Sequence, residues 1–138
     1  MELITNESIL GLILRVILGV LFFMQGYDKI IRVKMPEVIN TFRYEFGKLQ
    51  MPKGLLVISA YLSSFIELIC GFTLIIGVFT NYSLYLIGID LLLVTTAFSL
   101  INPVWDMKIV FPRIIIWAAL MLMPDMFNYV SLDHLLMK

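Results

Sequence analysis

The chain has 138 residues, of which 61% are hydrophobic and 14% are charged, and its mean hydropathy is +0.98. Soluble domains average about 45–50% apolar and about 25% charged residues, so the composition excludes an ordinary soluble domain and predicts a single membrane domain over residues 1–138. The formal net charge is zero, which leaves no basic field to attract nucleic acid, and no nucleic-acid partner is expected.

Four apolar segments follow one another along the chain, and each is a candidate helix across the bilayer. They cover residues 9–31, 55–78, 82–101 and 109–123. A membrane crossing needs about 20 helical residues; the first three segments meet this length and the fourth is short. The sequence therefore predicts an all-α fold, an integral membrane four-helix bundle of up-down-up-down topology.

The connection after the first segment is too long for a tight turn and has helical periodicity. Apolar side chains recur there on one face of a helix. They are Ile39, Phe42, Phe46 and Leu49. We therefore expect a short amphipathic helix over residues 36–49 that lies in the membrane interface; a solvated loop is the alternative.

Basic residues gather on the connections after the first and third segments. They are Lys29, Arg32, Lys34, Arg43, Lys48, Lys53 and Lys108. The opposite side offers Lys138. The positive-inside rule then predicts cytoplasmic loops at 32–54 and 102–108, with both termini outside. A multi-pass protein of the inner (plasma) membrane is expected.

Each segment carries one ionisable residue well inside its ends. These residues are Arg15, Glu67, Asp90 and Arg113. On insertion scales each costs roughly 2.5–3.5 kcal/mol near the centre of the membrane, so we expect the four side chains to face one another inside the bundle. The simplest arrangement pairs Glu67 with Arg113 and Arg15 with Asp90, and a contact of Arg15 with Glu67 stays open.

Two interpretations of this cluster compete. It is either a polar latch that fixes the order of the helices or a pocket that binds a headgroup, a quinone, a small anion or a partner residue, or relays a proton. Secondary candidates for the site are Gln25, Lys29, Cys70 and Trp117. Cys70 is interpreted as a packing residue, with a redox-sensitive thiol as the alternative. No catalytic residue is assigned.

The common redox groups of proteins cannot be built from this chain alone. Cys70 is the only cysteine and His134 the only histidine, which excludes an internal dithiol and a haem held between two histidines. No residues have the spacing of metal ligands. No metal and no covalent cofactor are therefore expected, whereas a quinone or a lipid could bind non-covalently.

Two stretches of the sequence resemble the DoxX family. RVILGVLFFMQGYDKI is similar to the first-helix pattern of that family, in which Arg, Leu-Gly, Phe, Gly and Lys recur in order, and ELICGFTLIIGVFT is similar to its second-helix pattern. Arg113 and the sequence SLD near the C-terminus also fit. Two positions depart from the pattern, since Asn81 stands where an arginine is common and Asp90 is not part of it.

The resemblance implies a four-helix protein of the inner membrane whose relatives have several roles. Some are small subunits of thiosulfate:quinone oxidoreductase, others accompany superoxide-, sulfur- or amine-oxidising systems, and distant ones are cargo receptors or assembly chaperones. The first hypothesis is an accessory subunit of a quinone- or sulfur-linked redox complex. In it Glu67 would exchange protons and Arg113 would hold a quinone oxygen. Any enzymatic role would be that of a subunit of such an oxidoreductase.

The second hypothesis is a non-enzymatic scaffold that docks another membrane protein, and a small transporter is the third, although no internal repeat supports it. Besides membrane lipids, the expected partner is another membrane protein or a second copy of the chain.

Overall fold

The computed structural model describes residues 6–46, 52–101, 107–123 and 131–132 of the chain. Its long helices are α1 (Asn6–Tyr27), α3 (Lys53–Ile76), α4 (Thr80–Ile101) and α5 (Met107–Leu122). A π-helical turn, η1 (Asp28–Arg32), extends α1, and the shorter α2 (Met35–Phe46) follows it. The bounds lie within a few residues of the segments predicted from hydropathy. Residues 47–49 of the predicted interfacial helix and most of the predicted 102–108 loop lie outside the described residues.

Three helical spans in the described residues are long and apolar enough to cross a membrane. They are Asn6–Arg32, Lys53–Ile76 and Thr80–Leu100. α5, with 16 residues, is shorter than the about 20 residues of a full crossing. Large apolar side chains such as Ile58, Phe65 and Leu92 are exposed on the outer faces of these helices, where hydrocarbon rather than water suits them. The chain is therefore a membrane protein.

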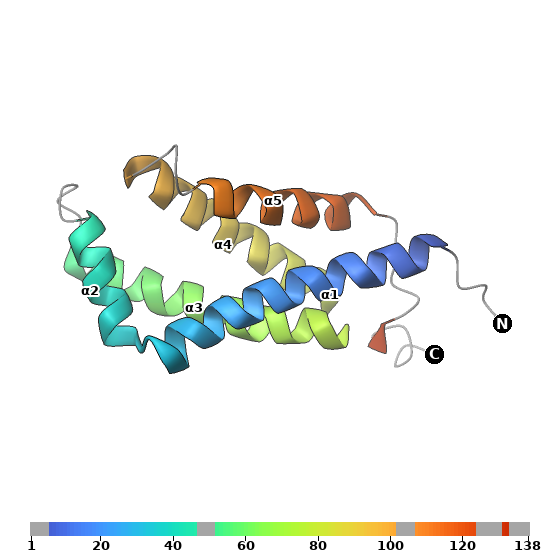
Figure 1. Ribbon diagram of the computed structural model, residues 1–138, viewed down its shortest axis with the longest axis horizontal. Coiled ribbons are helices and arrows are strands. Elements are labelled where there is room, and N and C mark those ends of the chain that lie inside the picture. Colours follow the sequence, from blue (N-terminus) through green and yellow to red (C-terminus); the bar gives the residue numbers. More distant parts are fainter. Residues whose placement is uncertain (1–5, 47–51, 102–106, 124–130, 133–138) are drawn as a thin grey trace.

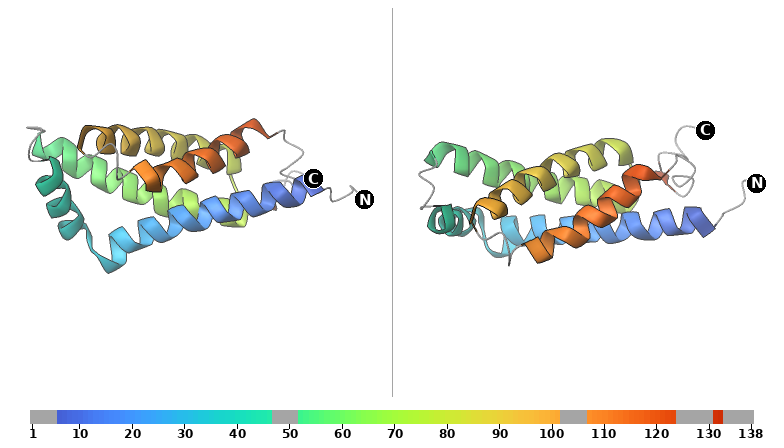
Figure 2. Two further views of the ribbon diagram at one scale, coloured as in Figure 1. Left: turned by 45° about the horizontal axis from the view of Figure 1, so that its top comes forward. Right: turned by 90° about the horizontal axis from the view of Figure 1, so that it is seen from above.

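The four long helices run along the long axis of the molecule, and α2 crosses one end of it (Figures 1 and 2). α3 packs against both α1 and α4, and α5 packs against both α4 and α1, so the long helices close into a ring. Apolar side chains from all four fill the middle of this ring. They are Leu18, Phe22, Cys70, Leu74, Leu84, Ile87, Leu91 and Val110.

Glycines allow α1 and α3 to approach more closely than other residues would permit. A Cβ atom on Gly71 would lie 2.3 Å from the backbone nitrogen of Phe23, and one on Gly26 would lie 2.5 Å from that of Leu68. Small residues at such positions are the usual means by which membrane helices pack tightly. This contact fixes the register of the two helices that carry the candidate site.

The turn between α3 and α4 is short because a glycine ends α3. Gly77 has φ +80°, a left-handed conformation, and the N–H of Val78 donates to the carbonyl of Thr73 at 3.0 Å, as in a Schellman motif. On either side of the turn, the hydroxyl groups of Thr73 in α3 and Ser83 in α4 lie 2.7 Å apart and link the two helices.

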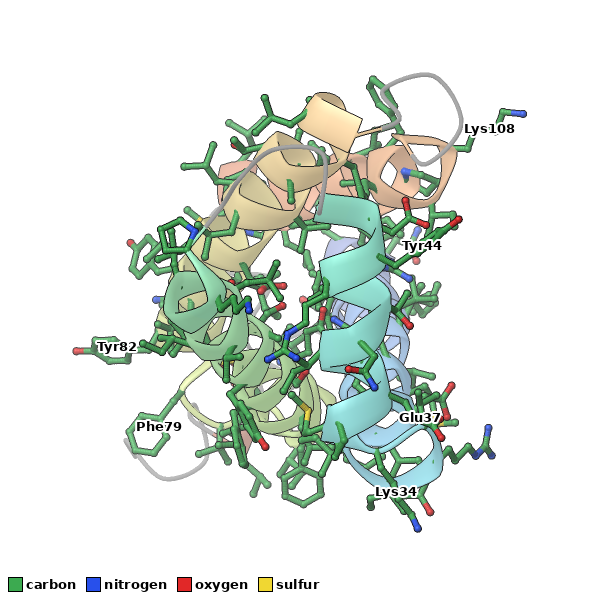
Figure 3. All side chains as sticks on the ribbon, turned by 90° about the vertical axis from the view of Figure 1, so that its left-hand side faces the viewer. Lys34, Glu37, Tyr44, Phe79, Tyr82 and Lys108 are labelled. Atoms are coloured by element: carbon green, nitrogen blue, oxygen red, sulfur yellow. The ribbon has the colours of Figure 1, made fainter. Side chains whose placement is uncertain are left out.

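α2 covers the end of the bundle with a face that includes the described part of the predicted series. Met35 and Val38 are buried, and Ile39 and Phe42 are half-buried. The buried face therefore begins one turn before the predicted series, whose last two members, Phe46 and Leu49, lie outside the side chains that the structure describes. In Figure 3, which looks at this end, α2 runs across the bundle, with Glu37 near its start and Tyr44 near its end.

Candidate functional site

The centre of the site is Glu67, which lies on the inward face of α3 and is 0% exposed. Its Oε1 atom accepts hydrogen bonds from Gln25 Nε2 at 2.7 Å and from Lys29 Nζ at 2.8 Å. The hydroxyl of Ser63, one turn earlier on α3, lies at 3.4 Å from the same oxygen. A buried carboxylate needs such donors, because leaving water without them is very costly. Glu67 therefore ties α3 to the end of α1.

Lys29 reaches Glu67 from η1, where the helix changes from α to π geometry. The N–H of Val33 donates to the carbonyl of Asp28 at 2.8 Å, which is the wider turn that defines a π-helix, a feature frequent at functional sites. Gln25 and Lys29 are four residues apart and so share one helical face. The Lys29 side chain is 19% exposed. Its ammonium group is therefore bonded to the buried carboxylate and still partly accessible from the surface.

Arg113 joins the same cluster from α5, but through Gln25. Its Nη1 atom donates a hydrogen bond to Gln25 Oε1, while Gln25 Nε2 donates to Glu67. The guanidinium also lies over the ring of Phe22 at 5.7 Å, a favourable cation–π distance. The expected direct pair of Glu67 with Arg113 is thus replaced, within the described residues, by an ion pair of Glu67 with Lys29 and an amide bridge to Arg113.

Asp90 enters the cluster from α4 and is likewise 0% exposed. Neither of its carboxylate oxygens accepts a hydrogen bond of normal length and angle from the residues that the structure describes. Ser63, Lys29 and Arg113 are nevertheless its polar and charged neighbours. Two carboxylates and two cations therefore share one buried cluster, and their formal charges cancel.

Arg15 does not belong to this cluster, which corrects its expected pairing with Asp90. Its guanidinium lies against the α3–α4 turn, where a Cβ atom on Gly77 would be 2.8 Å from Arg15 Nη2. Gly77 is ten residues beyond Glu67, or about 15 Å along the helix axis. Glu67 and Asp90 both lie near Ser63, so Arg15 and Asp90 are at different depths.

The remaining secondary candidates, Cys70 and Trp117, have packing roles. Cys70 is buried in the apolar core. The indole N–H of Trp117 donates to the carbonyl of Leu84 at 2.8 Å. The indole ring packs directly against Gly88, where an added Cβ atom would be only 2.6 Å from Trp117 Cζ2. Trp117 therefore joins α5 to α4, one turn from Arg113 on the same face.

A cavity of about 400 Å³ opens beside the cluster, between the end of α1 and helices α2, α3 and α4. Its polar end carries Gln25, Lys29 and Ser63, and most of the remaining wall is apolar. The aromatic rings among the lining residues are Phe42 of α2 and Phe98 of α4. Binding pockets for small molecules commonly have about 300–1,000 Å³ and a few polar groups on an apolar wall. The cavity is large enough for a ring-sized headgroup and part of an apolar tail.

Sequence reasoning ranked the members of this site in a different order. It placed Gln25 and Lys29 second, although both bond directly to Glu67, and it left Ser63 out of the site. One signal could have given Gln25 and Lys29 a higher rank among the candidate site residues. They lie one turn apart at the end of an apolar helix and so share one face. Nothing in the sequence indicated that α2 would close the cavity.

Comparison with known proteins matches residues 10–100 to the model of the DoxX family. This range holds α2, α3 and most of α1 and α4, and with them Gln25, Lys29, Glu67 and Asp90. No match was found among curated proteins or among solved structures.

Proposed function

The chain belongs to the DoxX family of membrane proteins, and from this premise we propose that it is an accessory subunit of a quinone-linked redox complex in the inner membrane. Its part would be to hold a quinone in the cavity beside Lys29 and Gln25. The observation that carries this proposal is an apolar cavity of about 400 Å³ with donor groups at one end.

The shape and chemistry of the cavity suit a molecule with a polar head and an apolar tail. The spare N–H groups of Lys29 and Gln25 would bind a quinone oxygen, and the apolar wall between α3 and α4 would take the first part of the tail. Leu55, Leu92 and Leu100 line this wall and are also more than half exposed on the outer surface. A lipophilic molecule could therefore enter sideways from the bilayer.

Glu67 does not line the cavity itself, but it bonds to two residues that do. Its carboxylate holds Gln25 and Lys29 in position through bonds of 2.7 and 2.8 Å. Since a quinone takes up protons when it is reduced, the carboxylates of Glu67 and Asp90 would exchange protons with it through Lys29, which bonds to Glu67 and lines the cavity. The chain has one cysteine and one histidine, so we propose that electrons come from a partner subunit.

The proposed topology follows the distribution of basic residues. The end of the bundle that carries α2 would face the cytoplasm, with α2 in the membrane interface, and both termini would lie outside. α5 would complete a four-helix bundle as a short crossing. Its 16 residues reach about 24 Å at 1.5 Å per residue, less than the about 30 Å of the hydrocarbon core, so the bilayer would thin locally around it.

A scaffold role is the second candidate, and the exposed side of α2 favours it. Tyr44 is 84% exposed at the end of that helix, and Arg43 beside it is exposed as well. Exposed tyrosine and arginine side chains are common at protein interfaces. A partner that docks there without any quinone in the cavity would support this role instead.

Quinone retained by the purified protein tests the first proposal. The protein is extracted gently from its native membrane, and the bound quinone is measured by solvent extraction and chromatography. Ala97→Phe adds a ring to the cavity wall and is expected to reduce the retained quinone at least about fivefold.

The matched control for this experiment is Ser99→Phe, which adds the same ring two residues later on an exposed position outside the cavity. It should retain the wild-type amount. Equal quinone in both variants, or none in the wild-type protein, would contradict the proposed function.

A further inference from the structure

We propose that the cavity distinguishes the two redox forms of its quinone and binds the oxidised form more tightly, because Lys29, the one charged residue among the described residues that line it, is a hydrogen-bond donor. This inference rests on the proposed function and adds a preference for quinone over quinol. The preference depends on which hydrogen-bonding groups at the polar end of the cavity are already bonded within the protein.

Donors remain available at that end. Lys29 has three ammonium hydrogens and Gln25 two amide hydrogens, and within the described residues each uses one of them on Glu67. The bond from Arg113 to Gln25 Oε1 also fixes the orientation of this amide, since it holds the oxygen toward α5 and leaves the nitrogen for Glu67 and the cavity. Two ammonium hydrogens and one amide hydrogen are therefore free to bind a ligand.

Two acceptors near the same end are occupied, since Glu67 Oε1 receives the N–H groups of Gln25 and Lys29, and Gln25 Oε1 receives Arg113. Glu67 Oε2 and both carboxylate oxygens of Asp90 accept no hydrogen bond from the described residues. Neither Glu67 nor Asp90, however, is among the residues that line the cavity. A ligand hydroxyl that needs a charged acceptor does not find one there.

Three hydroxyl groups complete the polar lining, and each is directed to a protein acceptor. Ser59 donates to the carbonyl of Leu56 at 3.1 Å, Thr96 donates to that of Leu92 at 2.8 Å, and Ser63 points to Glu67. These hydroxyls keep only neutral lone pairs for a ligand.

The two redox forms present different groups to this lining. A quinone carbonyl only accepts, so it can take a charge-assisted bond from Lys29 and a second bond from Gln25. A quinol hydroxyl must also donate, and only the neutral oxygens of serine or threonine are left to accept. Hydrogen bonds to a charged group are roughly twice as strong as neutral ones. We therefore expect the oxidised form to bind on the order of tenfold more tightly.

The test compares decylubiquinone with decylubiquinol, which share one tail and differ only in redox state. The full-length protein is placed in lipid nanodiscs, and each compound is titrated by calorimetry, the quinol without oxygen. The expected result is a dissociation constant about tenfold lower for the quinone.

Two variants tie the preference to the Lys29 ammonium. Removing Lys29 alone would strand the buried Glu67 carboxylate, so the pair is neutralised together as Lys29→Met with Glu67→Gln. We expect the two dissociation constants to become equal within about twofold in this double variant. Lys29→Arg keeps a cationic donor and should keep the preference.

Each outcome is decisive. Quinol that binds the wild-type protein as tightly as quinone would overturn the selectivity and leave the proposed function intact. A preference that survives in the double variant would overturn its assignment to Lys29. If neither compound binds, the proposed function fails, and the selectivity fails with it.

Discussion

At the scale of single residues, the site depends on Lys29 of η1. Lys29 is the direct ionic partner of Glu67, a carboxylate with 0% exposure. A buried ion pair contributes little net stability compared with apolar packing, but removing one partner leaves an uncompensated buried charge. The cluster should therefore respond strongly to a change in either Lys29 or Glu67 alone, and weakly to a change in both.

Lys29→Met is predicted to lower the free energy of unfolding by about 3–5 kcal/mol, because it leaves Glu67 buried without its cation. Unfolding of the purified protein by dodecyl sulfate in mixed micelles measures this loss. The double change of Lys29→Met with Glu67→Gln should recover most of it.

Arg32→Met is the matched control for that substitution. Arg32 pairs with Asp28 at 3.0 Å one turn away, but both side chains are largely exposed, and such pairs are worth about 0–1 kcal/mol. Equal losses from Lys29→Met and Arg32→Met would contradict the role given to Lys29.

The burial of a charge could be predicted from the sequence, but its depth and its partner could not. The cost of burial correctly indicated that Glu67 and Asp90 face inward, as both are fully buried. The partners depend on the rotation and stagger of each helix, which are set by the glycine contacts between α1 and α3. The position of Lys29 near a helix end also favours a side chain that extends to the interface, and this concealed its bond to Glu67.

At the scale of elements, the close contact of α1 and α3 holds Gln25 and Lys29 opposite Ser63 and Glu67. Gly71 lies where α1 and α3 approach each other most closely, since a Cβ atom there would be 2.3 Å from the backbone nitrogen of Phe23. Backbone cannot move aside as a flexible side chain can. An added methyl group would therefore push the two helices apart and separate the members of the site.

Gly71→Ala is predicted to lower the free energy of unfolding by about 1–3 kcal/mol through overpacking, although alanine favours a helix. The same unfolding titration measures the change. In the control Gly54→Ala, the new Cβ atom would have no neighbour within 4 Å, so stability should stay equal or rise by up to about 1 kcal/mol. A stabilising Gly71→Ala would show that this contact is looser than described.

Helix boundaries were predicted well because hydropathy and turn residues act locally. Short connections such as Gly77–Phe79 leave little choice for where α3 ends and α4 begins. The position of α2 was harder to predict, since packing against the bundle end also buries Met35 and Val38, which precede the periodic series beginning at Ile39. The cavity that α2 helps to close was likewise beyond prediction from periodicity.

At the scale of the whole molecule, exposed aromatic and basic residues lie at opposite ends. Phe79 and Tyr82 at the α3–α4 turn point away from the bundle (Figure 3) and pack edge to face at 6.4 Å between ring centroids. Aromatic side chains of this kind mark the interface between lipid and water. Exposed Arg32, Lys34 and Lys53 lie around α2, which agrees with the proposed cytoplasmic position of that end.

The proposed orientation predicts which side of the membrane each end can be labelled from. In intact cells a membrane-impermeant maleimide should modify Asn81→Cys at the start of α4, whereas Tyr44→Cys on α2 should react only after permeabilisation. Both positions are exposed, and the native Cys70 is buried, which keeps the background low. The reverse pattern of labelling would contradict the orientation.

Photochemical mapping of a quinone on the protein tests the proposed site most directly. An azido-quinone is added to the protein in native membrane vesicles, irradiated, and located by mass spectrometry of the peptides, with excess decylubiquinone as competitor. Labelling that the competitor removes is expected on the cavity-lining parts of α3 and α4, between Leu55 and Ser63 and between Leu92 and Leu100. Labelling spread evenly over the exposed faces, and unchanged by the competitor, would contradict a quinone site in this cavity.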